Sequence, residues 1–206
     1  MIEPSPPPAF PGYNHIKRYW DYHYGCYVAK ILPGEYYITR HHEILMTVVG
    51  SCVAACIRDS VNGIGGMNHF MLPSISEDKW EQTHVSAATR YGSFAMEYLI
   101  NEILKYGGQR KNLEVKLFGG GRMMKNMINI GQKNIDFVKE YIKIENLTLL
   151  AEDLGEIYPR KILFYQNNGR VRVKKLRSME QMIFEREKAY QHRLEKQPIV
   201  GEIDLF

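Results

Sequence analysis

The sequence contains few cysteines and no long apolar run. Of its 206 residues only three are cysteines, Cys26, Cys52 and Cys56, and this odd, sparse set does not predict a disulfide framework. The apolar stretches are much shorter than the roughly 20 residues that a membrane-spanning helix needs. The beginning of the chain also lacks the basic and then apolar segments that are typical of an export signal. We therefore expect a reduced, cytoplasmic protein without membrane insertion.

A strong charge imbalance is also missing. The 27 basic and 23 acidic residues give a net charge of +4, which is too mild to indicate a nucleic-acid partner. Arg170, Arg172 and Lys174 alternate along one predicted strand, but no aromatic residues lie between them to stack on bases. We interpret them as a solvated outer face and predict no nucleic-acid binding.

The spacing of possible metal and phosphate ligands is equally unfavourable. Cys56 follows Cys52 by four positions, which is not the two-residue gap of common zinc motifs. The glycines at residues 119–121 resemble a phosphate-binding loop, but the Lys-Ser/Thr pair of such a loop is absent and tight packing explains the glycines. We predict neither a metal nor a cofactor.

The composition, with 45% hydrophobic and 24% charged residues, is that of a folded domain. We divide the chain into a Pro- and aromatic-rich N-terminal arm (1–25), one domain (26–177) and a charged helical C-terminal tail (178–206). Within the tail, the apolar residues Ile203, Leu205 and Phe206 form a hypothetical docking segment for a partner.

Strand and helix patterns alternate along the predicted domain. Apolar and β-branched runs predict a strand ending near Val49, a sharp turn, a second buried element from Cys52, and strands at 64–72, 114–118, 147–153, 160–165 and 170–176. Apolar spacing predicts helices at 87–106, between 121 and 131, and at 134–143 with Asn134 as N-cap. This mixture indicates an α/β or α+β layered domain.

Cys52 has the setting of a nucleophile. It follows Gly50-Ser51 at a predicted turn between apolar runs, so the turn can expose its sulfur. We expect Gly50, Ser51 and Val53 to support this turn and to offer backbone N–H groups to an oxyanion. If the following segment were helical, its N-terminus would also favour the thiolate. The alternative role for Cys52 is that of a small buried apolar residue.

A cysteine nucleophile needs a base, and His69 is the best candidate. It interrupts an apolar run, and Gly65-Gly66 before it allow close backbone approach. Thr47 could orient the imidazole from the strand before Cys52. Both assignments have structural alternatives, a hydrogen-bonded core histidine and an ordinary strand threonine. The histidines in polar surroundings are better explained as solvated, and they are His41, His42 and His84.

These residues lie in two segments that resemble the chemoreceptor glutamine deamidase family, CheD. The segments are residues 47–59 (TVVGSCVAACIRD) and 65–73 (GGMNHFMLP). The resemblance continues through 30–37 (KILPGEYY), 89–92 (TRYG), 118–121 (FGGG), 130–134 (IGQKN) and 153–155 (DLG), and it covers roughly residues 26–177. Two positions are less regular: Met46 could replace Thr47 if the register differs, and Glu156 stands where a glycine is expected.

The resemblance implies a single-domain layered α/β/β sandwich similar to that of deamidating toxins. It also implies a protein-glutamine glutaminase that hydrolyses receptor glutamines to glutamate and releases ammonia, with Cys52 as nucleophile, His69 as base and Thr47 as third member. The implied partners are the cytoplasmic helices of chemoreceptors and a CheC-type phosphatase. An alternative function is a docking module that acts on these partners mainly by binding.

Overall fold

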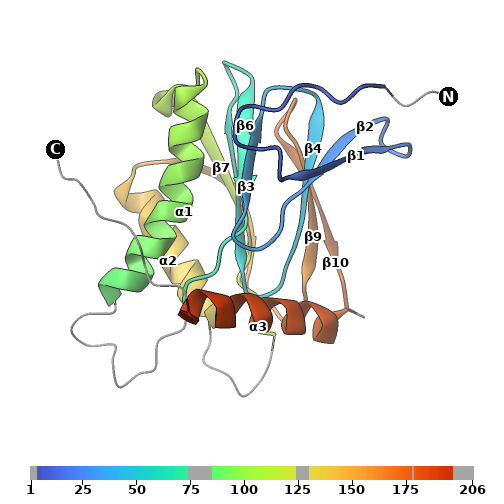
Figure 1. Ribbon diagram of the computed structural model, residues 1–206. Helices are drawn as coiled ribbons and strands as arrows, with labels where there is room; N and C mark the ends of the chain where they lie inside the picture. The colour runs from blue at the N-terminus through green and yellow to red at the C-terminus, as the bar shows by residue number, and fades with distance from the viewer. Residues whose placement is uncertain (1–3, 74–84, 124–129, 178, 197–206) are drawn as a thin grey trace.

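The computed structural model describes residues 4–73, 85–123, 130–177 and 179–196, and these form two packed sheets with helices beside one sheet and across one end (Figure 1). The first sheet has the order β1-β2-β4-β9-β10, with β1 Lys17–Asp21, β2 Cys26–Lys30, β4 Glu43–Val49, β9 Arg160–Tyr165 and β10 Arg170–Lys175. The second has the order β3-β6-β5-β7-β8, with β3 Tyr36–Thr39, β6 Ile64–Asn68, β5 Val53–Asp59, β7 Leu113–Gly119 and β8 Thr148–Leu154.

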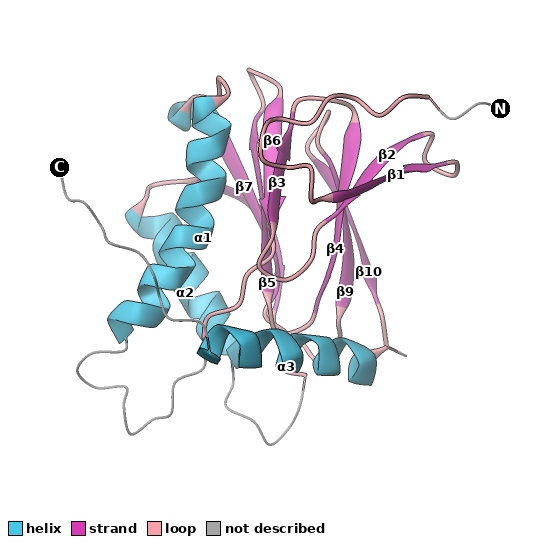
Figure 2. Cartoon of the chain, in the orientation of Figure 1, coloured by secondary structure: helices cyan, strands magenta, loops and turns pink. Residues whose placement is uncertain are grey.

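The helices occupy two different places. Helices α1 (Val85–Lys105) and α2 (Ile130–Ile144) cover the outer face of the second sheet, and the 3-10 helix η3 (Arg110–Asn112) precedes β7. Helix α3 (Glu180–Lys196) instead crosses one end of the two sheets (Figure 2). No helix in the described part of the chain is long and apolar enough to cross a membrane. Because α1 and α2 cover one of two packed sheets, the predicted α/β/β layering and the α+β class are confirmed.

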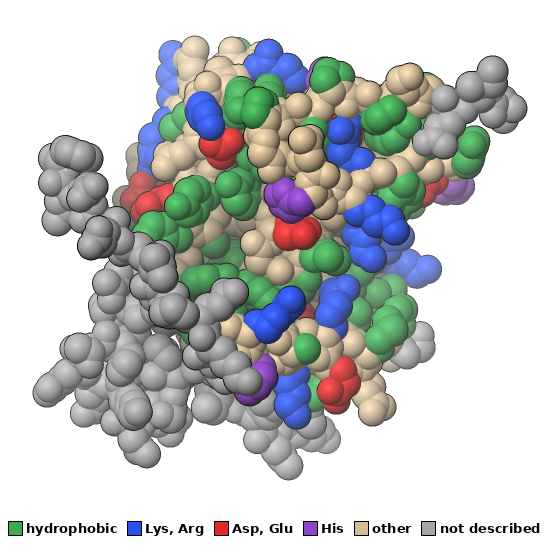
Figure 3. Space-filling view, viewed as in Figure 1, with side chains coloured by type: hydrophobic (Ala, Val, Ile, Leu, Met, Phe, Trp, Pro, Cys, Tyr) green, Lys and Arg blue, Asp and Glu red, His purple; other side chains and the backbone are tan. Residues whose placement is uncertain are grey.

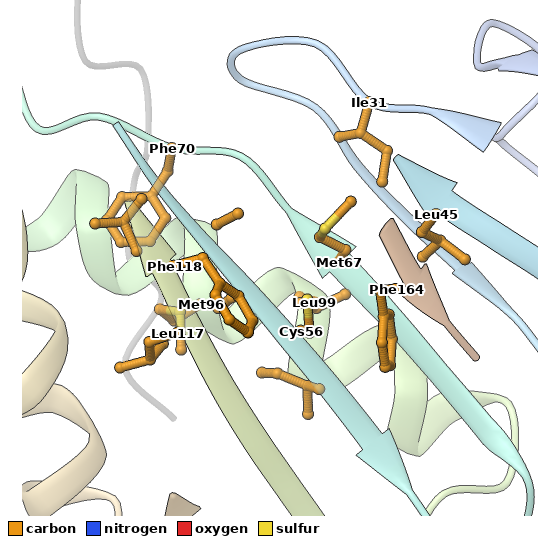
Figure 4. Close-up of a cluster of buried hydrophobic side chains, with 14 of the residues drawn as sticks. Ile31, Leu45, Cys56, Met67, Phe70, Met96, Leu99, Leu117, Phe118 and Phe164 are labelled. Carbon is orange, nitrogen blue, oxygen red and sulfur yellow. The ribbon is translucent and has the colours of Figure 1, made fainter. Parts of the chain in front are cut away.

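The main core fills the space between the sheets and under α1. Leu45 of β4 and Phe164 of β9 face Met67 of β6 across the two sheets, while Met96 and Leu99 approach from α1 (Figure 4). All of these side chains are buried. Since burial of one large apolar side chain stabilises a fold by about 1.5–3 kcal/mol, this core holds both sheets as one unit.

The chain passes repeatedly between the two sheets. Strands β2 and β4 are parallel neighbours in the first sheet, and β3, between them in sequence, belongs to the second. The chain then returns from β4 to β5 of the second sheet through residues 50–52. Cys52 therefore lies where the chain changes sheets, and the antiparallel pairing of β5 with β6 brings His69 back beside it.

Most predicted elements are confirmed, with corrections near the site. The segment after Cys52 is a strand, because β5 pairs with β6 on one side and β7 on the other, so a helix N-terminus does not favour the Cys52 thiolate. Helix α2 begins at Ile130, so Gly131 does not end a helix and Asn134 is not an N-cap. Most of the predicted helix between 121 and 131 lies outside the described residues.

The predicted arm and tail both contain residues that belong to the folded part of the structure. Strand β1 and Tyr13 belong to the predicted arm, yet β1 pairs with β2 and Tyr13 packs in the core. Helix α3 occupies most of the predicted tail. The docking hypothesis for Ile203, Leu205 and Phe206 falls outside the described residues. The division itself stays a prediction.

Asp59 ties the β5–β6 turn to the segment after α1. Its carboxylate accepts hydrogen bonds from the N–H groups of Val61, Asn62 and Gln109 and from the Asn62 amide, at 2.7–2.9 Å. Burial alone would raise the pKa of Asp59, but these hydrogen bonds outweigh it and lower the pKa to about 2. Asp59 therefore stabilises the fold by about 2 kcal/mol when ionised.

We expect Asp59→Asn to lower the free energy of unfolding by about 2 kcal/mol at pH 7. The pKa of an unfolded aspartate is about 3.9, so this stabilisation is complete above that pH and is lost as the pH falls toward the folded pKa of about 2. Urea denaturation at pH 7 and pH 3 would measure the difference. The exposed Asp136 provides the control, and equal losses for Asp136→Asn and Asp59→Asn would contradict the prediction.

Candidate active site

The turn from Gly50 to Cys52 is held rigidly by the glycines that follow β7. Gly121 N–H donates to the Gly50 carbonyl and Gly120 N–H donates to the Cys52 carbonyl, both at 2.7 Å. In a planar trans peptide the C=O and N–H groups point in opposite directions. The bond to the Gly50 carbonyl therefore turns the Ser51 N–H toward the opposite side.

Close packing explains the glycines at residues 119–121, as the sequence predicted. Gly119 has a φ of +112°, and a Cβ there would collide with the Cys52 carbonyl oxygen. Asn134 of α2 adds a further support, because its side-chain amide donates to the Ser51 carbonyl and accepts from Leu72 N–H, both at 2.8 Å. This double contact fixes the direction of the Cys52 N–H, and it is the reason for a buried asparagine inside α2.

His69 is held beside this turn by its own backbone and by Thr47. Its N–H donates to the Glu35 carbonyl at 2.9 Å, and its carbonyl accepts from Gly34 N–H at 2.7 Å. The side chains of Thr47 and His69 meet with 2.8 Å between Oγ1 and Nδ1. The alternative to Thr47, Met46, packs in a separate cluster with Val28 and Leu163. Thr47 is therefore the residue of this strand that contacts His69.

The hydrogen bonds of Thr47 assign the tautomer of His69. The Thr47 hydroxyl donates its single proton to the Ile31 carbonyl at 2.8 Å, so its oxygen must accept from His69 Nδ1–H. A neutral His69 then carries a lone pair on Nε2, the nitrogen left for Cys52. Nε2 is buried and has no hydrogen-bond partner among the described residues. Such a nitrogen can accept a proton from a thiol.

Cys52 and His69 are both uncharged in this arrangement. Burial, with the negative charge of Glu187, raises the pKa of the Cys52 thiol well above its usual value. Burial, with the positive charge of Arg186, lowers the pKa of His69 to about 3. Both charged neighbours come from α3. The site therefore contains a thiol and a neutral imidazole rather than an ion pair.

Glu187 of α3 is the site residue that the sequence did not predict. Its carboxylate accepts hydrogen bonds from the N–H groups of Gly50 (2.6 Å), Ser51 (2.7 Å) and, more weakly, Cys52 (3.4 Å), and from the Ser51 hydroxyl (2.7 Å). We call the three N–H groups of Gly50, Ser51 and Cys52 the amide cradle. A cradle of this kind binds negatively charged oxygen, as an oxyanion hole does.

Of the three residues expected to offer N–H groups to an oxyanion, Gly50, Ser51 and Val53, the structure places two in the cradle. Gly50 and Ser51 point their N–H groups into it, but Val53 does not, because Val53 N–H donates to the Phe70 carbonyl at 2.9 Å. Of the histidines that the sequence predicts to be solvated, His42 is exposed and His41 is half-buried, and His84 lies outside the described residues. A signal for Glu187 exists, since it is the one acidic residue in the otherwise apolar series Ile183, Glu187, Tyr190 and Leu194.

A metal ion could in principle use the same side chains. One ligand atom from each of Cys52, His69 and Glu187 lies within 4.8 Å of the others, and thiolate, imidazole and carboxylate are all zinc ligands. The Glu187 oxygens already accept hydrogen bonds from the cradle, and His69 keeps Nδ1 on Thr47. The amide cradle therefore accounts for the carboxylate without a cation.

Beside the site, a pocket of about 250 Å³ opens between β6 and α1. Its lining includes Gly34, His69, Tyr91, Phe94 and Tyr98.

A buried thiol, a histidine of fixed tautomer, a threonine that orients it and an amide cradle together define a hydrolase of the cysteine–histidine class on a two-sheet α/β fold.

Comparison with known proteins agrees with this class. Residues 71–175 match the family model described as CheD chemotactic sensory transduction. A probable chemoreceptor glutamine deamidase CheD of Halorhodospira halophila is 50% identical over 97% of this chain and 94% of its own length. Proteins of the same name from Hahella chejuensis and Methylobacillus flagellatus are 44% and 50% identical over 99% and 91% of this chain, and over 97% and 94% of their own lengths. The chain belongs to the CheD family.

Proposed function

We propose that this protein hydrolyses the side-chain amide of glutamine residues in chemoreceptors, giving glutamate and ammonia. The observation that carries the proposal is the convergence of the Cys52 thiol, the His69 imidazole and an amide cradle that holds a carboxylate. A carboxylate is the group that hydrolysis of a glutamine amide produces. The names of the relatives, chemoreceptor glutamine deamidases, supply the receptor as substrate.

Cys52 and the amide cradle each have one task in this reaction, and His69 transfers protons in every step. His69 Nε2 takes the proton of Cys52, and the sulfur attacks the amide carbon to give a tetrahedral oxyanion in the amide cradle. The imidazolium then protonates the amine and the C–N bond breaks. Ammonia departs, and the acyl group stays on Cys52 as a thioester. Water, deprotonated by His69, attacks the thioester, and the C–S bond breaks to give glutamate and the free thiol.

The reaction changes a neutral receptor side chain into an anionic one. A new charge on a packed helix alters repulsion between neighbouring helices, and in this way deamidation would tune signalling. We propose that it takes place in the cytoplasm on the cytoplasmic helices of the receptors. A CheC-type phosphatase stays a predicted partner.

The test is mass spectrometry of a purified receptor cytoplasmic fragment incubated with the full chain. Each hydrolysed amide adds about 1 Da, because NH₂ is replaced by OH. Peptide mapping then locates the new glutamates, and a fragment incubated without the protein corrects for spontaneous deamidation. A mass gain that depends on the protein supports the proposal. No gain on any receptor fragment, together with tight binding to it, would favour the docking module.

Thr47 is predicted to act as a positioning residue through His69. Thr47→Val removes the hydroxyl that accepts from His69 Nδ1, and we expect kcat/KM to fall about 10- to 100-fold because the imidazole shifts. Thr47→Ser keeps the hydroxyl and should retain most of the activity. The measurement is the pH profile of kcat/KM for both variants. Equal losses in Thr47→Val and Thr47→Ser would show that packing, not the hydroxyl, matters.

A further inference from the structure

Helix α3 covers the candidate active site with the buried carboxylate of Glu187. The Glu187 side chain is only 2% exposed, and a buried carboxylate is costly unless hydrogen bonds compensate it. Here the compensation comes from the amide cradle and the Ser51 hydroxyl. Glu187 thus presents to Cys52 the same chemical group that the proposed reaction leaves on its substrate.

The rest of α3 is arranged to hold this carboxylate in place. Ile183 and Tyr190 are buried on the same side as Glu187, and Leu194 is partly buried there, at spacings of three and four residues. Tyr190 packs against Gly34, where a Cβ would lie 2.8 Å from its hydroxyl, and its hydroxyl is 2.6 Å from that of Tyr91. Gly34 and Tyr91 also line the pocket beside His69.

The outward side of α3 is quite different. In Figure 3 basic and acidic side chains mix along the end of the molecule where α3 lies. The exposed residues of α3 include Glu185 and Lys188. Arg186 is only half-exposed, and its side chain donates to the Val48 carbonyl at 2.5 Å. The helix therefore docks by an apolar stripe with one acidic residue at its centre.

This docking closes the site. Cys52 is 0% exposed, so a glutamine side chain from another molecule cannot reach its sulfur while α3 is in place. Burial of the thiol, together with the negative charge of Glu187 beside it, raises the pKa of Cys52, which opposes formation of the nucleophile. The covered arrangement is therefore a resting state, and activity requires that α3 move.

We propose that α3 is a tethered product mimic, and that the surface beneath it is the docking site of a substrate helix that presents glutamine from an apolar stripe. This inference rests on the proposed function. Because the surface already binds one helix, a substrate helix needs its glutamine where Glu187 lies and apolar residues four before and three and seven after it, as Ile183, Tyr190 and Leu194 are. The substrate displaces α3 to bind.

The first test measures access to Cys52 and does not depend on deamidation. The full-length wild type, Glu187→Ala, Tyr190→Ala and Glu185→Ala are treated with iodoacetamide, and alkylation of each cysteine is followed by peptide mass spectrometry. We expect Cys52 to react at least about tenfold faster in Glu187→Ala and Tyr190→Ala. Glu185→Ala, on the exposed side of α3, should match the wild type, and the core residue Cys56 should stay protected in all four.

The second test asks whether α3 resembles the substrate. A synthetic peptide of residues 179–196 that carries Glu187→Gln is incubated with full-length Tyr190→Ala. We expect a gain of about 1 Da at position 187, and no gain in the matched peptide with Glu185→Gln. The wild-type peptide, with its carboxylate, should inhibit deamidation of a receptor fragment.

The outcomes separate the two proposals. Equal Cys52 alkylation in wild type, Glu187→Ala and Tyr190→Ala would overturn the mimic, even if receptors are deamidated. Faster alkylation without deamidation of receptor or peptide would leave α3 as the cover of the site but remove the proposed function. If a chelator alone frees Cys52 in the wild type, Glu187 is a metal ligand with Cys52 and His69, and the product mimic is overturned.

Discussion

Cys52→Ala is expected to eliminate deamidation of receptor glutamines while the protein keeps its fold. Among the described residues of the site, only the Cys52 thiol can form a thioester, because the neighbouring Ser51 hydroxyl could give only an ester. Removal of a nucleophile of this kind lowers the rate by more than about 10³-fold. Mass spectrometry of a receptor fragment gives the rate, and thermal unfolding of the variant confirms that it is folded.

Cys56→Ala is the matched control for this loss. Cys56 lies in the core four residues further along the chain, where β5 pairs it with Met67 of β6. Its replacement should cost some stability but leave the reaction rate unchanged at temperatures well below unfolding. If Cys52→Ala still deamidated receptors, the nucleophile would lie elsewhere. If Cys52→Ala restored chemotaxis in a deletion strain without deamidation, binding would be the main function.

The parts of the fold that local patterns determine could be predicted from the sequence. Strand β4 and strand β9 follow from apolar and β-branched runs, and the turn before β5 follows from the Gly-Ser pair after β4. The proximity of Cys52 and His69 also follows, because one hairpin, β5–β6, connects them and antiparallel pairing returns the chain to its starting point. Their contact needs no long-range information.

The errors arise where tertiary contacts determine the structure. A run such as residues 53–57 fits a buried strand or a buried helix equally well, and pairing with both β6 and β7 decides for the strand. Asn134 has the chemistry of an N-cap, but its amide contacts Ser51 and Leu72 instead. Glu156 adopts a φ of +64°, a left-handed conformation that glycine would adopt without strain.

Glu187 shows the limit of motif analysis most clearly. It is separated by 135 residues from Cys52, and its helix is charged enough to be interpreted as a solvated tail. Only the apolar residues at helical spacing on either side of Glu187 indicate that this face is buried. What the face covers depends on where the sheets end, and no local pattern records that.

His69→Gln is expected to reduce kcat/KM by about 10²- to 10⁴-fold, which is the usual contribution of a general base. Glutamine can keep a hydrogen bond to Thr47 Oγ1, but it cannot take the proton of Cys52 or deliver one to ammonia. We also expect slower alkylation of Cys52 in the Tyr190→Ala background when His69→Gln is added. The first effect reports on the complete reaction, and the second on formation of the thiolate alone.

His42→Gln is the matched control, since His42 is exposed and precedes β4 at the end remote from Thr47. It should leave both rates unchanged. If His69→Gln lost activity but kept fast Cys52 alkylation, His69 would serve in protonation of ammonia rather than in activation of the thiol. If both rates were kept, the buried Nε2 of His69 would have no part in the chemistry, and the base would have to come from a group brought by the substrate.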